Sequence, residues 1–279
     1  MRIKIKGVNY ELTRRLLRPI IDDYPPSTIK GNDDELQGKV MVVVGGNSGI
    51  GLAIVKEYLR HGANVVASAR RIGELDNIKS DKLEYLKWDV SDINESVSNI
   101  KLIINKYKKI DCVVLAAGVN AVPNRERDNS LDYKKEEIRY VHQINVIGVS
   151  EICKILKNYA EKKELPSLKI INIISAGAFS LVPEPYFTSK HAFYSFTEAF
   201  ADECKGLIKV YGIAPGEVRT KMIHKGLFSL FSFMTRNRRK AHPDEIAKLA
   251  MLMTSKGGDS LAGNIIVFDG GETMINPFL

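Results

Sequence analysis

A doubly wound α/β fold with a parallel sheet is predicted for this 279-residue chain by a regular alternation of apolar runs and helical segments. The first run, Val40–Val44, is uninterrupted and rich in β-branched residues, which is typical of a strand buried on both faces. Residues 50–61 follow with apolar side chains at helical spacing. Because the connections between successive segments are short, we expect about seven parallel strands with helices on both faces of the sheet.

The later elements continue the same alternation. Further strands are predicted at 64–68, 83–88, 111–116, 168–174, 207–213 and 264–268, and further helices at 92–107, 132–163, 187–205 and 243–254. Ligands of such sheets bind beyond the carboxyl ends of the strands. The residues that follow each strand are therefore the places to search for chemistry.

Residues 1–38 are predicted to be an extension. They begin with a short alternating run and end in two prolines and a cluster of turn residues. The run Arg14–Arg18 allows one basic helical turn, although a solvated face is the favoured interpretation. Residues 39–279 should then form a single catalytic domain.

Composition narrows the classes of function. The three cysteines are widely spaced, without zinc-like or CxxC pairing, which favours a reducing cytoplasm over a disulfide framework. The chain shows no secretory signal and no apolar run long enough to span a bilayer, so we expect no membrane partner. The net charge of +8 is moderate, and the basic residues match no nucleic-acid motif. His224 and His242 lack ligand spacing, so we expect no metal.

A glycine-rich loop follows the first strand and opens the first helix. Glycines at this point permit a tight turn and let the backbone approach a pyrophosphate, which the helix N-terminus stabilises. An ordinary strand-to-helix turn is the alternative, but the position after a buried strand favours dinucleotide binding. The candidate residues are Gly45, Asn47, Ser48, Gly49, Ile50 and Gly51.

With this loop the chain resembles the short-chain dehydrogenase/reductase family, in particular its single-domain, 3-oxoacyl-reductase-like branch. The resemblance runs from Lys39 to Gly271 and implies a Rossmann-type fold. It places Asp89 and Val90 at the adenine, and Ala116, Ala117 and Gly118 at the end of the fourth strand beside the cofactor. Two positions depart from the family, which usually has threonine at Val44 and a sheet-stabilising asparagine at Leu115.

The end of the second strand predicts the cofactor. Members that prefer NAD have an acidic residue there for the ribose hydroxyls. This chain has Ala69 at that position, followed by Arg70 and Arg71. Guanidinium groups suit a 2′-phosphate by charge and by paired donors, so we expect NADP(H).

The stretch Tyr186-Phe187-Thr188-Ser189-Lys190 resembles the family's Tyr-x-x-x-Lys motif. Residues four apart share one helix face, so the Lys190 ammonium should lie near the Tyr186 phenol and lower its pKa toward the working pH. By resemblance Lys190 also binds the nicotinamide ribose, and Ser175 binds the reacting oxygen. Ser175 stands only 11 positions before Tyr186, fewer than is usual, and Ser180 is a weaker alternative.

Two further stations complete the resemblance. Asn145 corresponds to the family's Asn-x-x-Gly and would keep a water near Lys190, although an amide bonded to backbone is the simpler alternative. The segment after the sixth strand matches Pro-Gly-x-x-x-Thr, and it supplies Pro215, Gly216, Val218 and Thr220 to the cofactor. The closing Asp269-Gly270-Gly271 turn often lies at a subunit interface, so we expect a homodimer or homotetramer.

The function predicted is hydride transfer between NADP(H) and a small carbonyl or alcohol substrate, with Tyr186 as acid and base. Residues 221–242 should cover the substrate. Their basic part, 236–240, suits an anionic substrate, or it is a solvated face of an amphipathic segment. A sugar-nucleotide or phosphosugar-modifying enzyme with a tightly bound cofactor is one alternative. A catalytically silent dinucleotide sensor is the other.

Overall fold

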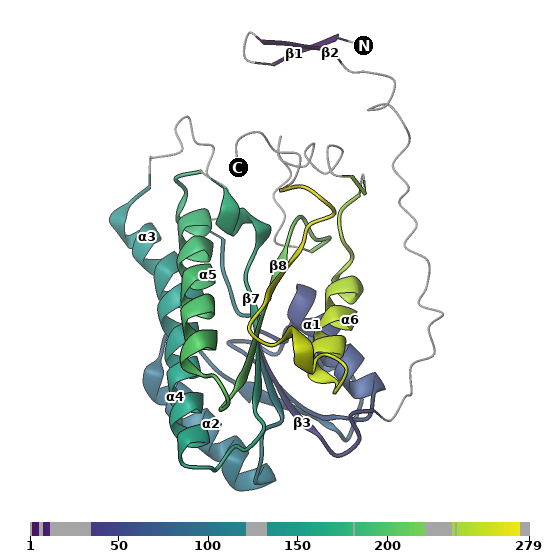
Figure 1. Ribbon diagram of the computed structural model, residues 1–279, viewed down its shortest axis with the longest axis vertical. Helices are drawn as coiled ribbons and strands as arrows, with labels where there is room; N and C mark the ends of the chain where they lie inside the picture. Colours follow the sequence, from purple (N-terminus) through teal and green to yellow (C-terminus); the bar gives the residue numbers. More distant parts are fainter. Residues whose placement is uncertain are drawn as a thin grey trace.

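The computed structural model of the chain describes residues 2–5, 8–11, 35–120, 133–180, 182–220, 236, 237 and 239–273. Within this part the fold is a parallel sheet covered by helices on both faces (Figure 1). The predicted basic turn at 14–18 and most of the predicted cover at 221–242 lie outside the described residues.

Seven parallel strands form the main sheet, in the order β5-β4-β3-β6-β7-β8-β9. Their bounds are β3 Val40–Val44, β4 Asn64–Ala69, β5 Leu83–Lys87, β6 Cys112–Leu115, β7 Lys169–Ile173, β8 Lys209–Pro215 and β9 Ile265–Phe268. Every predicted strand is confirmed to within two residues at each end, and the predicted doubly wound parallel sheet is confirmed with them.

Five long helices form the two outer layers. They are α1 Gly49–Arg60, α2 Ile93–Tyr107, α4 Val149–Glu161, α5 Pro185–Glu203 and α6 Pro243–Thr254. Helices α1 and α6 lie on one face, whereas α2, α4 and α5 lie on the other (Figure 1). Apolar side chains fill both spaces between sheet and helices, in two separate clusters. The strands are therefore buried on both faces, as their uninterrupted apolar runs predict.

The single helix predicted at 132–163 is divided in the structure. It comprises α3, Lys135–His142, then a π-helical turn at Gln143–Gly148, and then α4. A π-turn adds a residue without changing the apolar pattern much, so periodicity alone does not reveal it. Such turns are frequent at functional sites.

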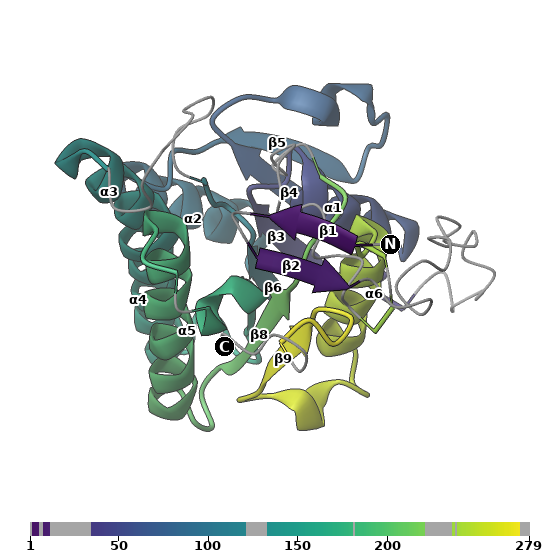
Figure 2. The same cartoon turned by 90° about the horizontal axis from the view of Figure 1, so that it is seen from above.

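Sheet topology locates the site. β3 pairs with β4 on one side and with β6 on the other, so the order of the chain reverses between β3 and β6. A crevice opens at the carboxyl ends of the strands at such a switch point. Figure 2 shows the molecule from above, where the labels of β5, β4, β3 and β6 follow one another across the sheet.

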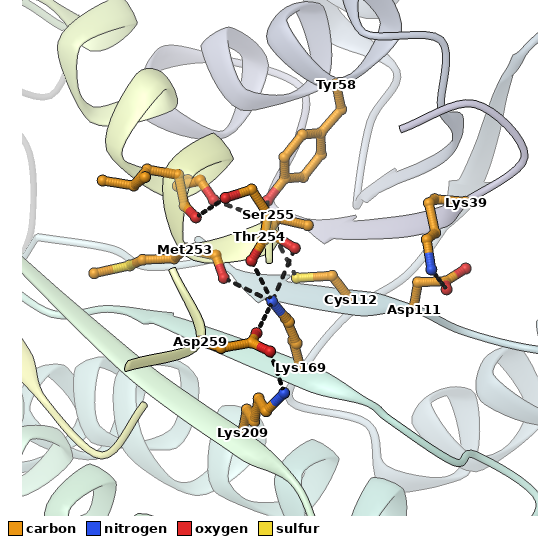
Figure 3. Close-up of polar contacts among 12 residues, drawn as sticks. Lys39, Tyr58, Asp111, Cys112, Lys169, Lys209, Met253, Thr254, Ser255 and Asp259 are labelled. Carbon is orange, nitrogen blue, oxygen red and sulfur yellow. Dashed lines mark hydrogen bonds and ion pairs between the residues drawn. The ribbon is translucent and has the colours of Figure 1, made fainter. Parts of the chain in front are cut away.

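The amino end of the sheet is closed by a polar cluster around Lys169, the first residue of β7 (Figure 3). Its ammonium lies 3.2, 2.9 and 2.8 Å from the carbonyl oxygens of Met253, Thr254 and Ser255, and 2.7 Å from Asp259 Oδ1. Lys209 donates to the other Asp259 oxygen at 2.6 Å. The cation thus satisfies the carbonyl groups at the C-terminus of α6, where the helix dipole favours positive charge.

The predicted extension contains two short strands, β1 Arg2–Ile5 and β2 Val8–Glu11, which pair with each other in antiparallel register. The division at residue 38 remains a prediction. Among the helices described here, none combines the length and apolar character that a membrane crossing requires.

Candidate active site

A cavity of about 660 Å³ opens at the carboxyl ends of β3, β4 and β6. Most of the residues predicted from the sequence line it together. They are Gly45, Asn47, Ser48, Gly49, Ile50, Gly51, Arg70, Arg71, Asp89, Val90, Ala116, Ala117, Gly118, Tyr186, Lys190 and Thr220. The other predicted site residues do not line this cavity; they are Asn145, Ser175, Pro215, Gly216 and Val218.

Close backbone contacts explain the glycine loop. Gly45 has φ +87°, and a Cβ atom there would stand 2.5 Å from the backbone nitrogen of Ala117. A Cβ on Gly51 would stand 2.1 Å from the carbonyl oxygen of Gly45. A side chain at Gly51 would push α1 away from the end of β3, and a side chain at Gly45 would push the glycine loop away from the end of β6. The absence of Cβ atoms leaves the N-terminus of α1 open toward the cavity, a geometry that favours an anionic group.

Thr220 lies against the same helix terminus. A Cβ built on Gly49, which has φ +53°, would stand 3.2 Å from Thr220 Cγ2. The segment after β8 and the glycine loop therefore meet at one point, as expected if both bind the same pyrophosphate.

Positive charge gathers at the end of β4. Arg70 and Arg71 follow Ala69 and line the cavity, and Arg70 Nη1 donates to the Tyr140 hydroxyl at 3.2 Å. Burial opposes ionisation of Asp89, but two bonds from Ser91 and the nearby charges of Arg70 and Lys87 together lower the pKa of its carboxyl group. The described residues thus fit a dinucleotide, with an open helix N-terminus for phosphates and guanidinium groups beside the position of the adenosine ribose.

Ser175 lies near enough to Tyr186 for its hydroxyl to lower the pKa of the phenol, despite their short separation in sequence. Ser175 follows β7 and is the N-cap of a 3₁₀ turn, η3 (Ala176–Phe179), in which its hydroxyl accepts from the Gly177 amide at 3.0 Å. A Cβ on Gly177 would stand 2.8 Å from the Phe187 ring. The tight turn therefore requires glycine, and it brings Ser175, not Ser180, against Tyr186.

Two α5 side chains, one helical turn apart, contact the 3₁₀ turn η3. His191 Nδ1 lies 2.8 Å from the Ala178 carbonyl oxygen, so this nitrogen carries the proton that makes the bond. The rings of Phe179 and Tyr194 meet edge to face with centroids 5.0 Å apart. The serine is thus positioned by the same helix that carries the tyrosine.

The electrostatics of Tyr186 differ from the expectation. Burial raises the pKa of the phenol above its usual value, and the hydrogen bond from Ser175 offsets only part of that rise. The Lys190 ammonium lies 5.9 Å from the centroid of the tyrosine ring, and burial lowers the pKa of Lys190 itself to about 8. The prediction that Lys190 lowers the pKa of the phenol was wrong for the protein alone, because burial raises this pKa and Lys190 is not among the groups that lower it.

Asn145 lies in the π-turn and anchors the end of β6. Its Oδ1 accepts from the Val119 amide, and its Nδ2 donates to the Val119 carbonyl, both at 2.8 Å. Nδ2 also donates to Ser189 Oγ at 3.0 Å. A Cβ on Gly118 would stand 3.4 Å from Asn145 Oδ1 and 3.5 Å from Lys190 Nζ, so the three groups are neighbours. The side-chain amide is thus bonded to backbone, and a water relay through Asn145 remains a prediction.

The segment after β8 rests on the end of β9. The Gly216 amide donates to the Phe268 carbonyl at 3.1 Å, and a Cβ on Gly216 would stand 2.8 Å from Asp269 Cβ. Val218 forms an isolated parallel bridge with Ala241. The Pro215–Thr220 segment therefore has a fixed path from β8 to the N-terminus of α1.

Sequence reasoning missed several residues of the site. Trp88, Val119, Ile144, Ile173 and Ile174 line the cavity. Tyr140 supports Arg70, which also lines it, and His191 supports the turn that follows Ser175. The strand residues could have been found from their place at carboxyl ends of strands, whereas Tyr140 and His191 carry no local signal. Leu115, which replaces the family's asparagine, is fully buried opposite Asn172 of β7. No group of acidic, histidine and cysteine residues suited to a metal ion occurs within the described ranges.

Comparison with known proteins agrees with this geometry. The family model for short chain dehydrogenases matches residues 39–226. The chain is 26% identical to short-chain dehydrogenase reductase 3b of Arabidopsis thaliana over 87% of this chain and 98% of that one. It is 27% identical to the 3-oxoacyl-[acyl-carrier-protein] reductase of Thermotoga maritima, over 85% and 98% of the two chains.

The fold also matches solved structures. A short chain dehydrogenase from Burkholderia cenocepacia, solved in complex with NADP, superposes with a TM-score of 0.75 at 23% identity, covering 86% of this chain and 99% of that one. The family uses NAD(H) or NADP(H) to act on alcohol and carbonyl groups. The dinucleotide crevice, the proximity of Ser175 to Tyr186 and the family match together lead to one conclusion: the chain belongs to the short-chain dehydrogenase/reductase family of oxidoreductases.

Proposed function

We propose that this protein interconverts a carbonyl compound and an alcohol with NADP(H), using Tyr186 as the proton donor and acceptor. The observation that carries this proposal is that Tyr186 and the buried Lys190 line one cavity, which a glycine loop opens, with Ser175 near enough to lower the pKa of the phenol. A polarised oxygen placed between the Ser175 and Tyr186 hydroxyls would meet two donors at once.

Tyr186 suits proton donation during reduction. Its raised pKa keeps the phenol protonated at neutral pH, so a proton is available for a developing alkoxide. Ser175 donates a second hydrogen bond to the same oxygen and stabilises its charge, with its own position fixed by the Gly177 amide. The cofactor, when bound, supplies the hydride.

Lys190 provides the positive charge of the site. Its ammonium lies in the cavity wall close to Gly118, where it would bind ribose hydroxyls and hold a proton for Tyr186. A pKa of about 8 leaves it charged at neutral pH and able to release a proton at modest cost. Asn145 is proposed to complete the path to solvent.

The choice of NADP(H) rests on three residues at the end of β4. Ala69 contributes no carboxylate that would repel a 2′-phosphate, and both Arg70 and Arg71 line the cavity next to it. Tyr140 holds the Arg70 guanidinium in place at 3.2 Å. A preoriented guanidinium loses less freedom when it binds phosphate.

We also propose a cytoplasmic homo-oligomer acting on a small substrate. The three cysteines are free and buried, which fits a reducing compartment. Edge strand β9 exposes Val267, and it ends in the Asp-Gly-Gly turn that the family often buries between subunits. An anionic substrate would be bound by the basic residues in 236–240. Within this segment, Arg239 donates two hydrogen bonds to Glu245.

The Tyr186→Phe variant tests the mechanism. It removes the proton donor but keeps the ring that packs on Phe187, so NADPH binding should remain while NADPH oxidation falls by about 10³-fold or more. Activity is measured by NADPH absorbance over a panel of keto-acyl thioesters, ketoses and phosphosugars, and binding by quenching of Trp88, the only tryptophan. Full turnover in this variant would refute the assignment.

The Arg70→Ala variant tests the cofactor. The loss of one charge-assisted contact to the 2′-phosphate should weaken NADPH by about 10- to 100-fold and leave NADH nearly unchanged. Equal losses for the two cofactors would refute the preference for NADP(H).

A further inference from the structure

Glu272 lies where the segment that follows β9 packs on the Gly216–Glu217 turn. The nearest atom to a Cβ built on Gly216 would be Glu272 Oε2, at 2.7 Å, and the next would belong to Asp269. The Glu217 amide donates a hydrogen bond to the Glu272 carboxyl group. One side chain therefore contacts both residues of the turn, and the amide of Gly216 is itself bonded to Phe268.

Two carboxyl groups at this point have opposite surroundings. Asp269 accepts from the amides of Gly271 and Thr273 at 2.8 and 2.7 Å, and these bonds, together with the Thr273 hydroxyl, outweigh burial and lower its pKa. Glu272 Oε2 is inaccessible to solvent and has no hydrogen-bond partner among the described residues. Burial, followed by the charges of Glu217 and Asp269, raises the pKa of Glu272 to about 7. Such a pair settles with one group ionised and the other able to keep its proton.

Within the described part of the chain, the basic side chains near Glu272 are directed to other groups. Lys240 Nζ lies 3.2 Å from Glu217 Oε2, so this cation is directed to the neighbouring acid. The aliphatic part of Arg236 packs on Gly271, and Arg239 forms two bonds to Glu245 in the adjoining small cavity. The two charged groups that change the pKa of Glu272 are thus Glu217 and Asp269, and both are acidic.

We propose that Glu272 is a positioning residue, whose protonated carboxyl group holds the Gly216–Glu217 turn against the end of β9 and whose ionisation releases it. The inference rests on the proposed function in one respect, that the Pro215–Thr220 segment contacts the cofactor, as the family resemblance implies. A neutral carboxylic acid can stay buried against Gly216 at lower cost than a carboxylate, which Asp269 and Glu217 would repel. The cofactor should therefore bind less tightly as the pH rises through neutrality.

The stability of the protein without cofactor tests the ionisation itself. The folded pKa of about 7 lies above the ordinary 4.5, so the folded state holds more protons than the unfolded state between these values. Stability contributed by Glu272 is present at low pH and lost as the pH rises through that window. The melting temperature of the wild type should fall between pH 5.5 and 8 by about 3 °C or more relative to Glu272→Gln, which keeps the shape of the protonated acid.

Cofactor binding tests the coupling. The dissociation constant of NADPH is followed by Trp88 quenching, and between pH 6 and 8 it should rise more in the wild type than in Glu272→Gln. The additional rise should be about tenfold for each unit by which NADPH binding raises the pKa of Glu272. Glu217→Gln removes one charge that raises the pKa of Glu272, so the pH-dependent transition should move to lower pH in this variant. Asp202→Asn, which removes a carboxylate from an exposed side chain, should keep both wild-type slopes.

The outcomes separate the inference from the proposed function. Equal pH dependence of melting in the wild type and Glu272→Gln would show that Glu272 does not titrate there and would overturn the inference. A difference in melting without a difference in NADPH binding would overturn the coupling. Absence of NADPH binding at every pH would overturn the proposed function, while the melting data would still report on Glu272.

Discussion

The two ends of the sheet each bury a lysine, and the two lysines have opposite surroundings. Lys169 at the amino end is within 3.2 Å of three carbonyl oxygens and one carboxylate oxygen. Lys190 at the carboxyl end has one hydrogen bond in the described structure, to the Ile173 carbonyl at 3.2 Å. Burial lowers the pKa of Lys190 to about 8, a sign that its desolvation is not compensated.

The difference separates a stabilising charge from a reactive one. The ammonium of Lys169 completes the C-terminus of α6 and joins β7 to it, so its contacts are all within the fold (Figure 3). The ammonium of Lys190 faces a cavity, and its unused hydrogen-bonding capacity is what a ligand can take up. We infer that Lys169 stabilises the fold at the amino end of the sheet, whereas the buried charge of Lys190 destabilises it at the carboxyl end. Ligand binding beside Lys190 would offset that destabilisation.

The largest effect is expected when the reactive lysine is removed. Lys190→Met should lower NADPH-dependent turnover by about 10³-fold, because the site loses its buried positive charge. The same variant should be as stable as the wild type or more stable, since it replaces a poorly compensated buried charge with an apolar chain. Turnover is measured with the best substrate of the panel and stability by urea unfolding. A marked loss of stability would contradict the distinction between the two lysines.

Removal of the other lysine should have the reverse result. Lys169→Met leaves the carbonyl groups of α6 and Asp259 without their cation, and the free energy of unfolding should fall by about 2–4 kcal/mol. Turnover per folded molecule should stay within about twofold of the wild type. Lys209→Met is the matched control, because it removes a half-exposed partner of Asp259 and should cost about 1 kcal/mol or less.

The smallest effect is a dependence of stability on pH. Because the folded pKa of Lys190 is about 8 and the ordinary value is 10.5, the unfolded state binds more protons between these values. The penalty of burying the charged lysine is complete below pH 8 and is relieved as the pH rises. The wild type should therefore gain about 2 kcal/mol relative to Lys190→Met between pH 8 and 10. Parallel curves for the two proteins would show that Lys190 is not desolvated as described.

The sequence predicts the strands and long helices well, because each is encoded by a local pattern of apolar residues. It also predicts most residues of the cavity, since glycines and the Tyr-x-x-x-Lys motif are local signals. It does not predict the Lys169 cluster, in which the partners of the lysine ammonium stand 84 to 90 positions further along the chain. The sign of the pKa shift of Tyr186 was wrong for a related reason: burial is a property of the whole fold, and spacing along a helix reports only proximity.

The π-turn at Gln143–Gly148 fixes the rotational phase of everything that follows it. One residue in an α-helix corresponds to about 100° of rotation, so an extra residue decides which side chains of α4 face the sheet. Gly148 marks how tightly this phase is set, because a Cβ there would stand 2.1 Å from the Val90 carbonyl oxygen. Loss of a single residue from this turn would therefore turn the buried face of α4 toward solvent and carry Asn145 away from Val119. Insertions and deletions, more than substitutions, should be excluded from this stretch of the chain.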